Sequence, residues 1–172
     1  MLRLEFPNES HKAMYQEVID ELWNMWLELL HPDSIFWGNG ERDFSYVLKC
    51  LISDKKGESP WRVPCTSFLL VDDKKIYGAL SLRHHINHPN LIHRGGHIGY
   101  GIRPSERGKW YATQMLSLWL IEAKKLWLEK VLLTCQSENF GSKRVIEKNG
   151  GILESEQTDE KGERFLRYWI EL

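Results

Sequence analysis

Apolar residues recur with the spacing of an amphipathic helix in three parts of the chain. In residues 10–30 and 41–53 they lie three and four positions apart, and the same pattern runs on from about residue 110. The third stretch carries the broadest apolar stripe, which includes Trp119 and Trp127. The pattern therefore predicts three helices and places these two tryptophans in the core.

After about residue 63 the period changes from that of helices to that of strands. Two β-rich runs separated by four charged residues predict an antiparallel hairpin. The order of elements predicts a mixed α/β (α+β) domain, built on one mostly antiparallel sheet flanked by helices. Beyond the three helices, the expected elements are a short strand over 2–6, hairpin strands over 68–71 and 76–82, strands over 97–102 and 131–135, a helix over 142–148 and a final hairpin over 152–172.

The predicted strand over residues 97–102 has one face with almost no side-chain volume. Its even-numbered residues are apolar or aromatic, whereas Gly99 and Gly101 on the other face carry no side chain. A strand face of this kind lets a ligand or another backbone approach closely. We therefore expect this strand to border a binding site.

Length and charge narrow the class of protein. The 172 residues suit one domain with a sizeable core, and 23 Lys and Arg against 24 Asp and Glu leave a formal net charge of −1. This balance gives no long-range attraction to nucleic-acid phosphates or anionic lipid. Three widely separated cysteines without a C-x-x-C pair indicate free thiols in a reducing compartment. No apolar run has the length of a signal peptide or a membrane span. We expect a cytoplasmic protein with neither nucleic-acid nor membrane partners.

A basic loop joins the glycine-rich strand to the third helix. Arg103, Arg107 and Lys109 supply positive charge, and Gly108 lets the backbone approach a ligand closely. The start of the helix adds unpaired N–H groups and the positive end of the helix dipole. Together these features predict a site for an anion such as a pyrophosphate. The alternative is an ordinary strand-to-helix turn with solvated basic side chains.

Two segments resemble motifs of the GNAT superfamily of N-acetyltransferases. The first, HIGYGIRPSERGKWYA over residues 97–112, resembles motif A, whose pattern is Arg/Gln-x-x-Gly-x-Gly/Ala. Arg107 occupies the first position of that pattern and Ala112 the last. The second, LTCQSENFGSKRVIEKNGG over residues 133–151, resembles the strand and helix that follow in the same superfamily. The likeness covers about residues 63–172.

The resemblance implies an N-acetyltransferase that uses acetyl-CoA as its co-substrate and needs no metal. Residues 1–172 would form one GNAT-like domain, with 63–172 as the CoA-binding core and 1–62 as a variable helical part on the acceptor side. In that fold two neighbouring strands splay apart and the acyl-pantetheine arm enters the gap. The acceptor amine attacks the thioester directly, and a strand N–H near Tyr100 to Ile102 stabilises the oxyanion. The implied cofactor-binding residues are Ile102, Arg103, Arg107, Gly108, Lys109, Trp110, Tyr111, Ala112, Asn139 and Ser142.

Two positions depart from the family pattern. Position 110 is normally a glycine. The indole of Trp110 must therefore point away from the start of the helix, or it would crowd the pyrophosphate. A helical backbone at position 110 would let the indole point away. At position 146 many members place a tyrosine that protonates the leaving thiolate, and Ile146 cannot do so, which leaves that role to water. The alternative function is a catalytically impaired GNAT-like module that binds CoA or another ligand.

The candidate catalytic residues are His97 and Tyr100. His97 opens the glycine-rich strand and could act as the base, the alternative being a structural histidine. Tyr100 is either an acid or part of the pocket wall. Further candidate bases are His84 and His85, which end the preceding strand, and Glu106 in the loop. The five histidines between positions 84 and 97 match no standard zinc spacing, so we predict no metal there.

Aromatic residues of the N-terminal third are candidates for contact with the acceptor. Trp26 belongs to a helical stripe, whereas Phe36 and Trp37 lie in a glycine-rich turn and could hold an acceptor by stacking or cation–π contact. Trp23 lies nearby in the sequence. The alternative is a hydrophobic plug beneath a surface loop. The acceptor is expected to be a primary amine of a small molecule or peptide, and the sequence identifies no interface for a homodimer.

Overall fold

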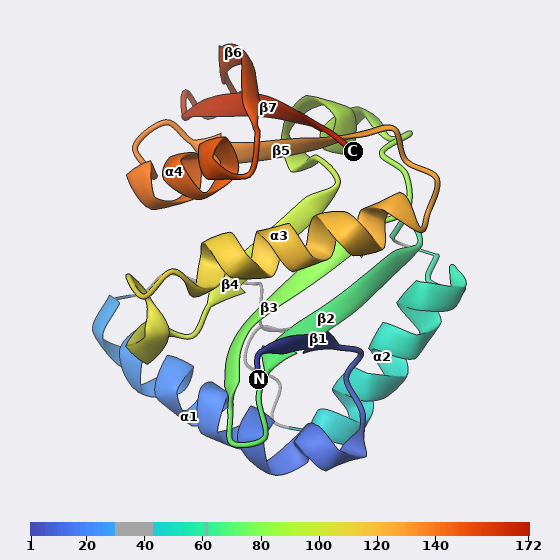
Figure 1. Ribbon diagram of the computed structural model, residues 1–172, viewed down its shortest axis with the longest axis vertical. Coiled ribbons are helices and arrows are strands. Elements are labelled where there is room, and N and C mark those ends of the chain that lie inside the picture. The colour runs from blue at the N-terminus through green and yellow to red at the C-terminus, as the bar shows by residue number, and fades with distance from the viewer. Residues whose placement is uncertain (30–42, 61) are drawn as a thin grey trace.

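The computed structural model describes residues 1–29, 43–60 and 62–172, and of residues 23–29 it describes only the backbone. In chain order the elements are β1 (Arg3–Glu5), the 3₁₀ turn η1 (Glu9–His11), α1 (Lys12–Leu29), α2 (Phe44–Lys56), β2 (Cys65–Val71), β3 (Ile76–Arg83), the π-helical turn η2 (Leu91–Gly95), β4 (Ile98–Ile102), the 3₁₀ turn η3 (Pro104–Glu106), α3 (Tyr111–Lys124), β5 (Lys130–Gln136), α4 (Phe140–Lys148), β6 (Ile152–Thr158) and β7 (Arg164–Glu171) (Figure 1).

These elements confirm the helices, strands and hairpins that the hydrophobic period predicts. The boundaries differ where a cap decides them. α2 runs on to Lys56, where Gly57, at φ +72, ends it in the left-handed conformation. α4 begins at Phe140 because the side chain of Asn139 accepts a hydrogen bond from the amide of Ser142. The turn η2 was not predicted, because its residues have no helical apolar period.

The strands form two antiparallel sheets, one ordered β1-β2-β3-β4 and the other β5-β7-β6. The mixed, mostly antiparallel architecture is therefore confirmed, but the predicted single sheet is divided between β4 and β5. Figure 1 shows the second sheet lying beside β4, with α3 crossing in front of the first. The gap between β4 and β5 leaves space for a binding site.

β4 and β5 meet at one end, around His97. The amide of His97 donates to the carbonyl of Leu132 at 2.8 Å, and the amide of Leu132 donates back to Nδ1 of His97 at 2.9 Å. Gly96, just before, has φ +60, and a Cβ added there would lie 2.5 Å from the Leu132 carbonyl oxygen. The absence of a side chain at Gly96 thus permits the close approach from which the two strands diverge.

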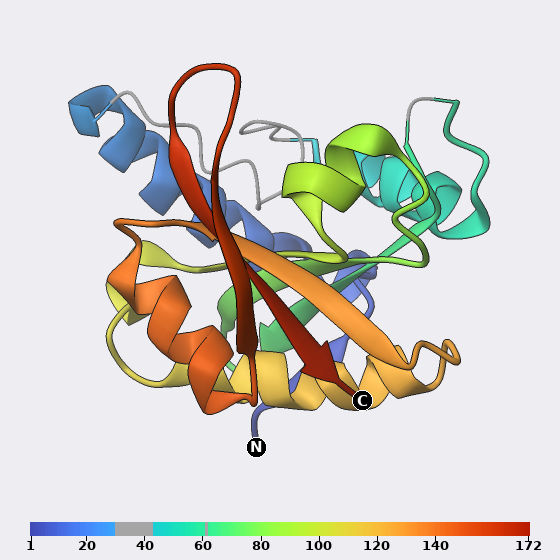
Figure 2. The same cartoon turned by 90° about the horizontal axis from the view of Figure 1, so that it is seen from above.

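Helices cover both faces of the first sheet (Figure 2). On one face α1 and α2 enclose a core cluster with alternate residues of β2 and β3, which include Leu69, Val71 and Ala79. On the other face α3 packs through Met115 and Trp119 into a cluster that continues into β5 and β7. The second cluster joins the two sheets and fixes α3 relative to both.

The prediction that both tryptophans of the third helix are buried is half right. Trp119 is fully buried, whereas Trp127 is 93 % exposed. α3 ends at Lys124, so the helical spacing that suggested burial no longer applies at position 127. Trp127 instead has φ 59 in the turn after the helix, where left-handed geometry is common.

Some predictions concern aromatic residues that the structure does not describe. Phe36 and Trp37 lie outside the described residues, as do the side chains of Trp23 and Trp26. Among the described helices none combines the length and apolar character needed to cross a bilayer. The three cysteines are free thiols, with Cys65 and Cys135 buried and Cys50 exposed.

Candidate active site

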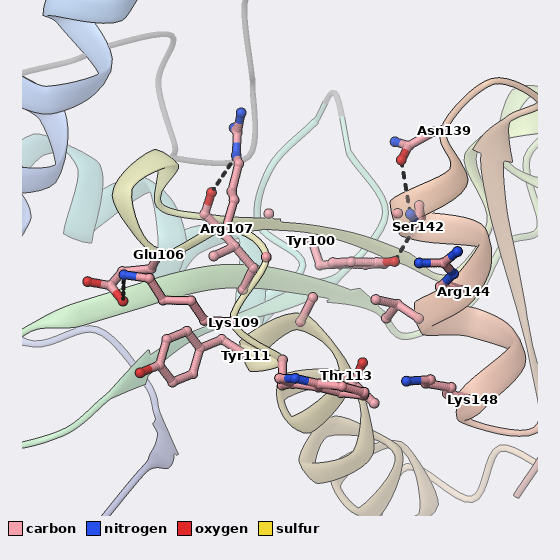
Figure 3. Close-up of a pocket in the computed structure, with 17 residues that line it drawn as sticks. Tyr100, Glu106, Arg107, Lys109, Tyr111, Thr113, Asn139, Ser142, Arg144 and Lys148 are labelled. Carbon is pink, nitrogen blue, oxygen red and sulfur yellow. Dashed lines mark hydrogen bonds and ion pairs between the residues drawn. The ribbon is translucent and has the colours of Figure 1, made fainter.

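A cavity of about 590 Å³ lies between β4, the start of α3 and one face of α4 (Figure 3). Its volume falls in the range of about 300–1,000 Å³ that is usual for small-molecule sites. Tyr100, Gly101 and Glu106 border it, and so do nine of the ten residues that the resemblance implies for cofactor binding: Ile102, Arg107, Gly108, Lys109, Trp110, Tyr111, Ala112, Asn139 and Ser142.

Arg103 is the tenth, and the structure places it elsewhere. Its Nε donates to a carboxylate oxygen of Glu21 on α1 at 2.5 Å, and its Nη1 lies 3.7 Å from Glu17. The amide and hydroxyl of Ser105 donate to the same Glu21 carboxylate. Arg103 therefore holds the loop against α1, and a cofactor contact by its side chain is not supported.

The carboxylate of Glu106 is tied to the loop cations. Glu106 is buried and accepts hydrogen bonds from the ammonium groups of Lys75 and Lys109, the latter at 3.3 Å. The hydrogen bond from Lys75, above all, holds the pKa of Glu106 below its usual value. A carboxylate held in its charged, paired form in this way is a poor base, and its contacts fix the loop.

The start of α3 presents amide donors to the cavity that no described residue caps. Trp110 is the N-cap residue, and its side chain makes no capping hydrogen bond. The first amides of a helix have no intrahelical acceptor, and Tyr111, Ala112 and Thr113 all border the cavity. Gly108, at φ +77, turns the chain into this position. This arrangement fits a phosphate or pyrophosphate group.

Trp110 corrects one expectation from the sequence. Its backbone is left-handed, at φ 70 and ψ −6, rather than helical. This conformation disfavours residues with a Cβ by about 1–2 kcal/mol and suits glycine, the residue of the family pattern at this position. Trp110 is 69 % exposed, and Nζ of Lys148 lies 3.6 Å from the centroid of its ring. The ring borders the cavity without filling it.

One face of α4 forms the opposite wall. Asn139 caps the helix, with its Oδ1 accepting the amide of Ser142 at 2.9 Å. Figure 3 shows Arg144 and Lys148 extending from α4 toward α3. Helical spacing from Ser142 could have identified this face, although nothing in the sequence says that it turns toward α3. The wall residues that sequence reasoning missed are Thr113, Gly141, Arg144, Val145 and Lys148.

Tyr100 and Ser142 meet across the cavity. Their hydroxyl oxygens lie 2.8 Å apart, which joins β4 to α4 (Figure 3). Burial raises the pKa of Tyr100 to about 12, so the phenol stays protonated at neutral pH. Because the amide of Arg103 pairs with β3, alternation along the strand directs the amides of Tyr100 and Ile102 away from β3, toward the gap. The pair and these amides supply donors at the inner end of the cavity.

His97 does not reach the cavity. The ring is 5 % exposed, and its Nδ1 accepts the Leu132 amide, so the proton of the neutral ring resides on Nε2. Burial, followed by the charge of Arg83, lowers the pKa of His97 to about 4. With neither nitrogen offering a free lone pair, the prediction of His97 as the base is not supported, and the histidine serves to join the strands.

Ile146 lies in the core rather than in the cavity. Its side chain is fully buried in the cluster that joins α3, β5 and β7. A hydroxyl is nonetheless available from the same helix, because Ser142 lies one turn earlier and faces Tyr100. Among the side chains that the structure describes, no three from His, Cys, Asp or Glu gather as metal ligands.

Comparison with protein families gives one match. Residues 45–152, more than half of the chain, match the model of a family described as an acetyltransferase (GNAT) domain. The chain belongs to the GNAT acetyltransferase family. A comparison of this GNAT chain with curated proteins gave no match.

Solved structures share the fold of this GNAT domain at low sequence identity. RimJ of Mycobacterium smegmatis, in complex with CoA-disulfide, has a TM-score of 0.71 and 17 % identity over 99 % of this chain and 81 % of its own. The microcin C7 self-immunity acetyltransferase MccE, in complex with acetyl-CoA and AMP, has a TM-score of 0.69 and 16 % identity over 99 % and 92 %. The ribosomal-protein-S5-alanine acetyltransferase of Vibrio fischeri has a TM-score of 0.66 and 17 % identity over 99 % and 92 %.

Proposed function

We propose that this protein is an acetyl-CoA-dependent N-acetyltransferase that acts on a primary amine of a small molecule or peptide. The cavity beside the uncapped start of α3 carries the proposal, because it presents amide donors at one end and the Tyr100–Ser142 pair at the other. Structural relatives bound to acetyl-CoA or CoA-disulfide support the same ligand. Residues 63–172 would bind the CoA, and residues 1–62 would face the acceptor. The charge balance and cysteine pattern support a cytoplasmic location.

Acetyl-CoA supplies the activated acetyl group. Transfer forms an N–C bond to the acceptor and breaks the C–S bond. The acceptor nitrogen loses a proton to water, and the leaving thiolate must be stabilised and then protonated. A thiol has a pKa near 8.5, whereas the pKa of Tyr100 is about 12. Complete proton transfer from Tyr100 to the thiolate is therefore uphill. We assign to the Tyr100–Ser142 pair the role of hydrogen-bond donor, with the proton coming from water.

Calorimetric titration tests the proposal directly. We expect acetyl-CoA to bind with micromolar affinity, since an anion-binding helix start and a formed cavity need little rearrangement. Binding should be accompanied by release of free CoA thiol when an acceptor amine is present. The absence of binding at millimolar acetyl-CoA would contradict the proposal. Binding without thiol release across a panel of small amines and N-terminal peptides would favour the impaired binding module.

Tyr100→Phe is expected to lower kcat by about tenfold, the usual effect of one hydrogen bond to a charged group. The loss should be the same from pH 6 to pH 9, because the phenol does not titrate in that range. Ser142→Ala should give a loss of similar size. Tyr168→Phe is the matched control, because this buried tyrosine contacts Glu147 outside the cavity. An unchanged kcat in Tyr100→Phe would remove Tyr100 from the mechanism.

A further inference from the structure

The two walls of the cavity differ in how their positive charges are engaged. On the loop, Nζ of Lys109 donates to the carbonyl of Ser105 at 2.8 Å and to Glu106 at 3.3 Å. On α4, Arg144 and Lys148 face the cavity, and neither is paired with a carboxylate in the described parts of the chain. The loop's other cavity cation, Arg107, donates through Nε to the carbonyl of Ile102 at 3.1 Å. The α4 wall therefore presents two cations without a carboxylate partner among the described residues.

Trp110 brings a second, unusual feature to the same place. It keeps a left-handed backbone that suits glycine, at the start of a helix where no ordinary cap requires it. A strained residue at a cavity suggests a role for its side chain. Lys148 lies over the indole at 3.6 Å from the ring centroid, while 69 % of the residue remains exposed. The indole thus has surface left for a flat group.

We propose that Trp110, Arg144 and Lys148 form a subsite for the 3′-phosphorylated adenosine end of CoA. This inference rests on the proposed function. The indole stacks on the purine, as aromatic rings do with nucleic-acid bases. Arg144 and Lys148 lie four positions apart on one helix face and bind the ribose phosphate, whose charge approaches two. The position at which the family carries glycine has become a specificity determinant in this chain.

Comparison of CoA with dephospho-CoA tests the phosphate contact by calorimetry. We expect the wild type to bind dephospho-CoA at least about tenfold more weakly, the effect of losing charge-assisted hydrogen bonds. Lys148→Met and Arg144→Met should weaken binding of CoA to a similar degree and leave dephospho-CoA unchanged. Lys143→Met is the matched control, because Lys143 is on α4 but does not line the cavity. Equal affinity of the wild type for both ligands overturns the phosphate contact.

Trp110→Gly tests the stacking contact. The glycine accepts φ 70 without strain, so the variant should fold, and it should bind CoA several-fold more weakly than the wild type. Trp127→Gly is the control, since it removes another exposed tryptophan with positive φ, from the far end of α3. Adenosine 3′,5′-bisphosphate should quench tryptophan fluorescence in the wild type and in Trp127→Gly but not in Trp110→Phe. Equal or tighter CoA binding by Trp110→Gly would show that the indole crowds the site, and would overturn the stacking contact.

The outcomes separate this inference from the function on which it rests. If the wild type binds neither acetyl-CoA nor CoA, the proposed function itself fails. If it binds both, and dephospho-CoA equally well, with Arg144→Met, Lys148→Met and Trp110→Gly unaffected, the function stands and the subsite is wrong.

Discussion

Gly96→Ala is expected to lower the free energy of unfolding by about 3 kcal/mol, the upper range for a forced backbone conformation combined with a buried clash. Gly96 has φ 60 and ψ −169, a region that is essentially restricted to glycine. An added Cβ would lie 2.5 Å from the carbonyl oxygen of Leu132, and a backbone atom cannot move aside as a side chain can. Relief would require β4 and β5 to separate where His97 holds them together.

Chemical denaturation of the wild type and the variant measures this loss. Gly99→Ala is the matched control, because Gly99 lies on β4 without a positive φ and no described atom comes within 4 Å of an added Cβ. It should change the free energy of unfolding by less than about 0.5 kcal/mol. Because the same contact fixes the divergence of the strands, Gly96→Ala should also weaken acetyl-CoA binding. A Gly96→Ala protein as stable as Gly99→Ala would contradict the close approach of the two strands.

Because of His97, the free energy of unfolding is expected to fall by about 3 kcal/mol as the pH is lowered from 6.5 to 4. Its pKa is about 4 in the folded state, because of burial and then the nearby Arg83 charge, against about 6.5 in the unfolded chain. The unfolded state therefore binds the proton more tightly. Above pH 6.5 the ring is neutral in both states, and its contribution is fully present. As the pH falls from 6.5 to 4, stability is lost at about 1.4 kcal/mol per pH unit.

Denaturation curves between pH 7 and pH 4.5 for the wild type and His97→Gln test this contribution. Glutamine cannot titrate and can still accept the Leu132 amide, so the variant should lose stability more slowly as the pH falls. A remaining slope is expected from His84, whose pKa is also lowered, chiefly by burial. The difference between the two slopes isolates His97. Parallel curves would show that the ring is protonated in the folded state without cost.

The position of the cavity depends on few residues of the sequence, and they are close together. Gly108 and the residues after it turn a strand into a helix, and such a local turn is set by φ preferences and by the unpaired amides of a helix start. Asn139 likewise caps α4 through a contact three residues away. Local geometry of this kind is encoded within a few residues, so the motif could predict which residues border the cavity. Their roles toward a ligand remain predictions.

The contacts that correct the sequence-based predictions span long separations. Arg103 is bound by Glu21, and His97 is held by Leu132; no hydrophobic period could indicate either partner. The same holds for Lys148 over Trp110, which depends on how α4 lies against α3. Exposure of Trp127 follows from the end of α3 at Lys124.

The sequence by itself determined the elements, the mixed antiparallel architecture and the loop on which an anion is expected, because hydrophobic period and turn chemistry act between neighbours. Only the tertiary structure decided which charged groups remain free for that anion. A carboxylate such as Glu106 or Glu21 neutralises a loop cation when folding brings the two together, and that pairing depends on packing between distant segments. Within the described parts of the chain, Arg144 and Lys148 on α4 line the cavity without a carboxylate partner, and Lys148 lies over a tryptophan where the family has glycine.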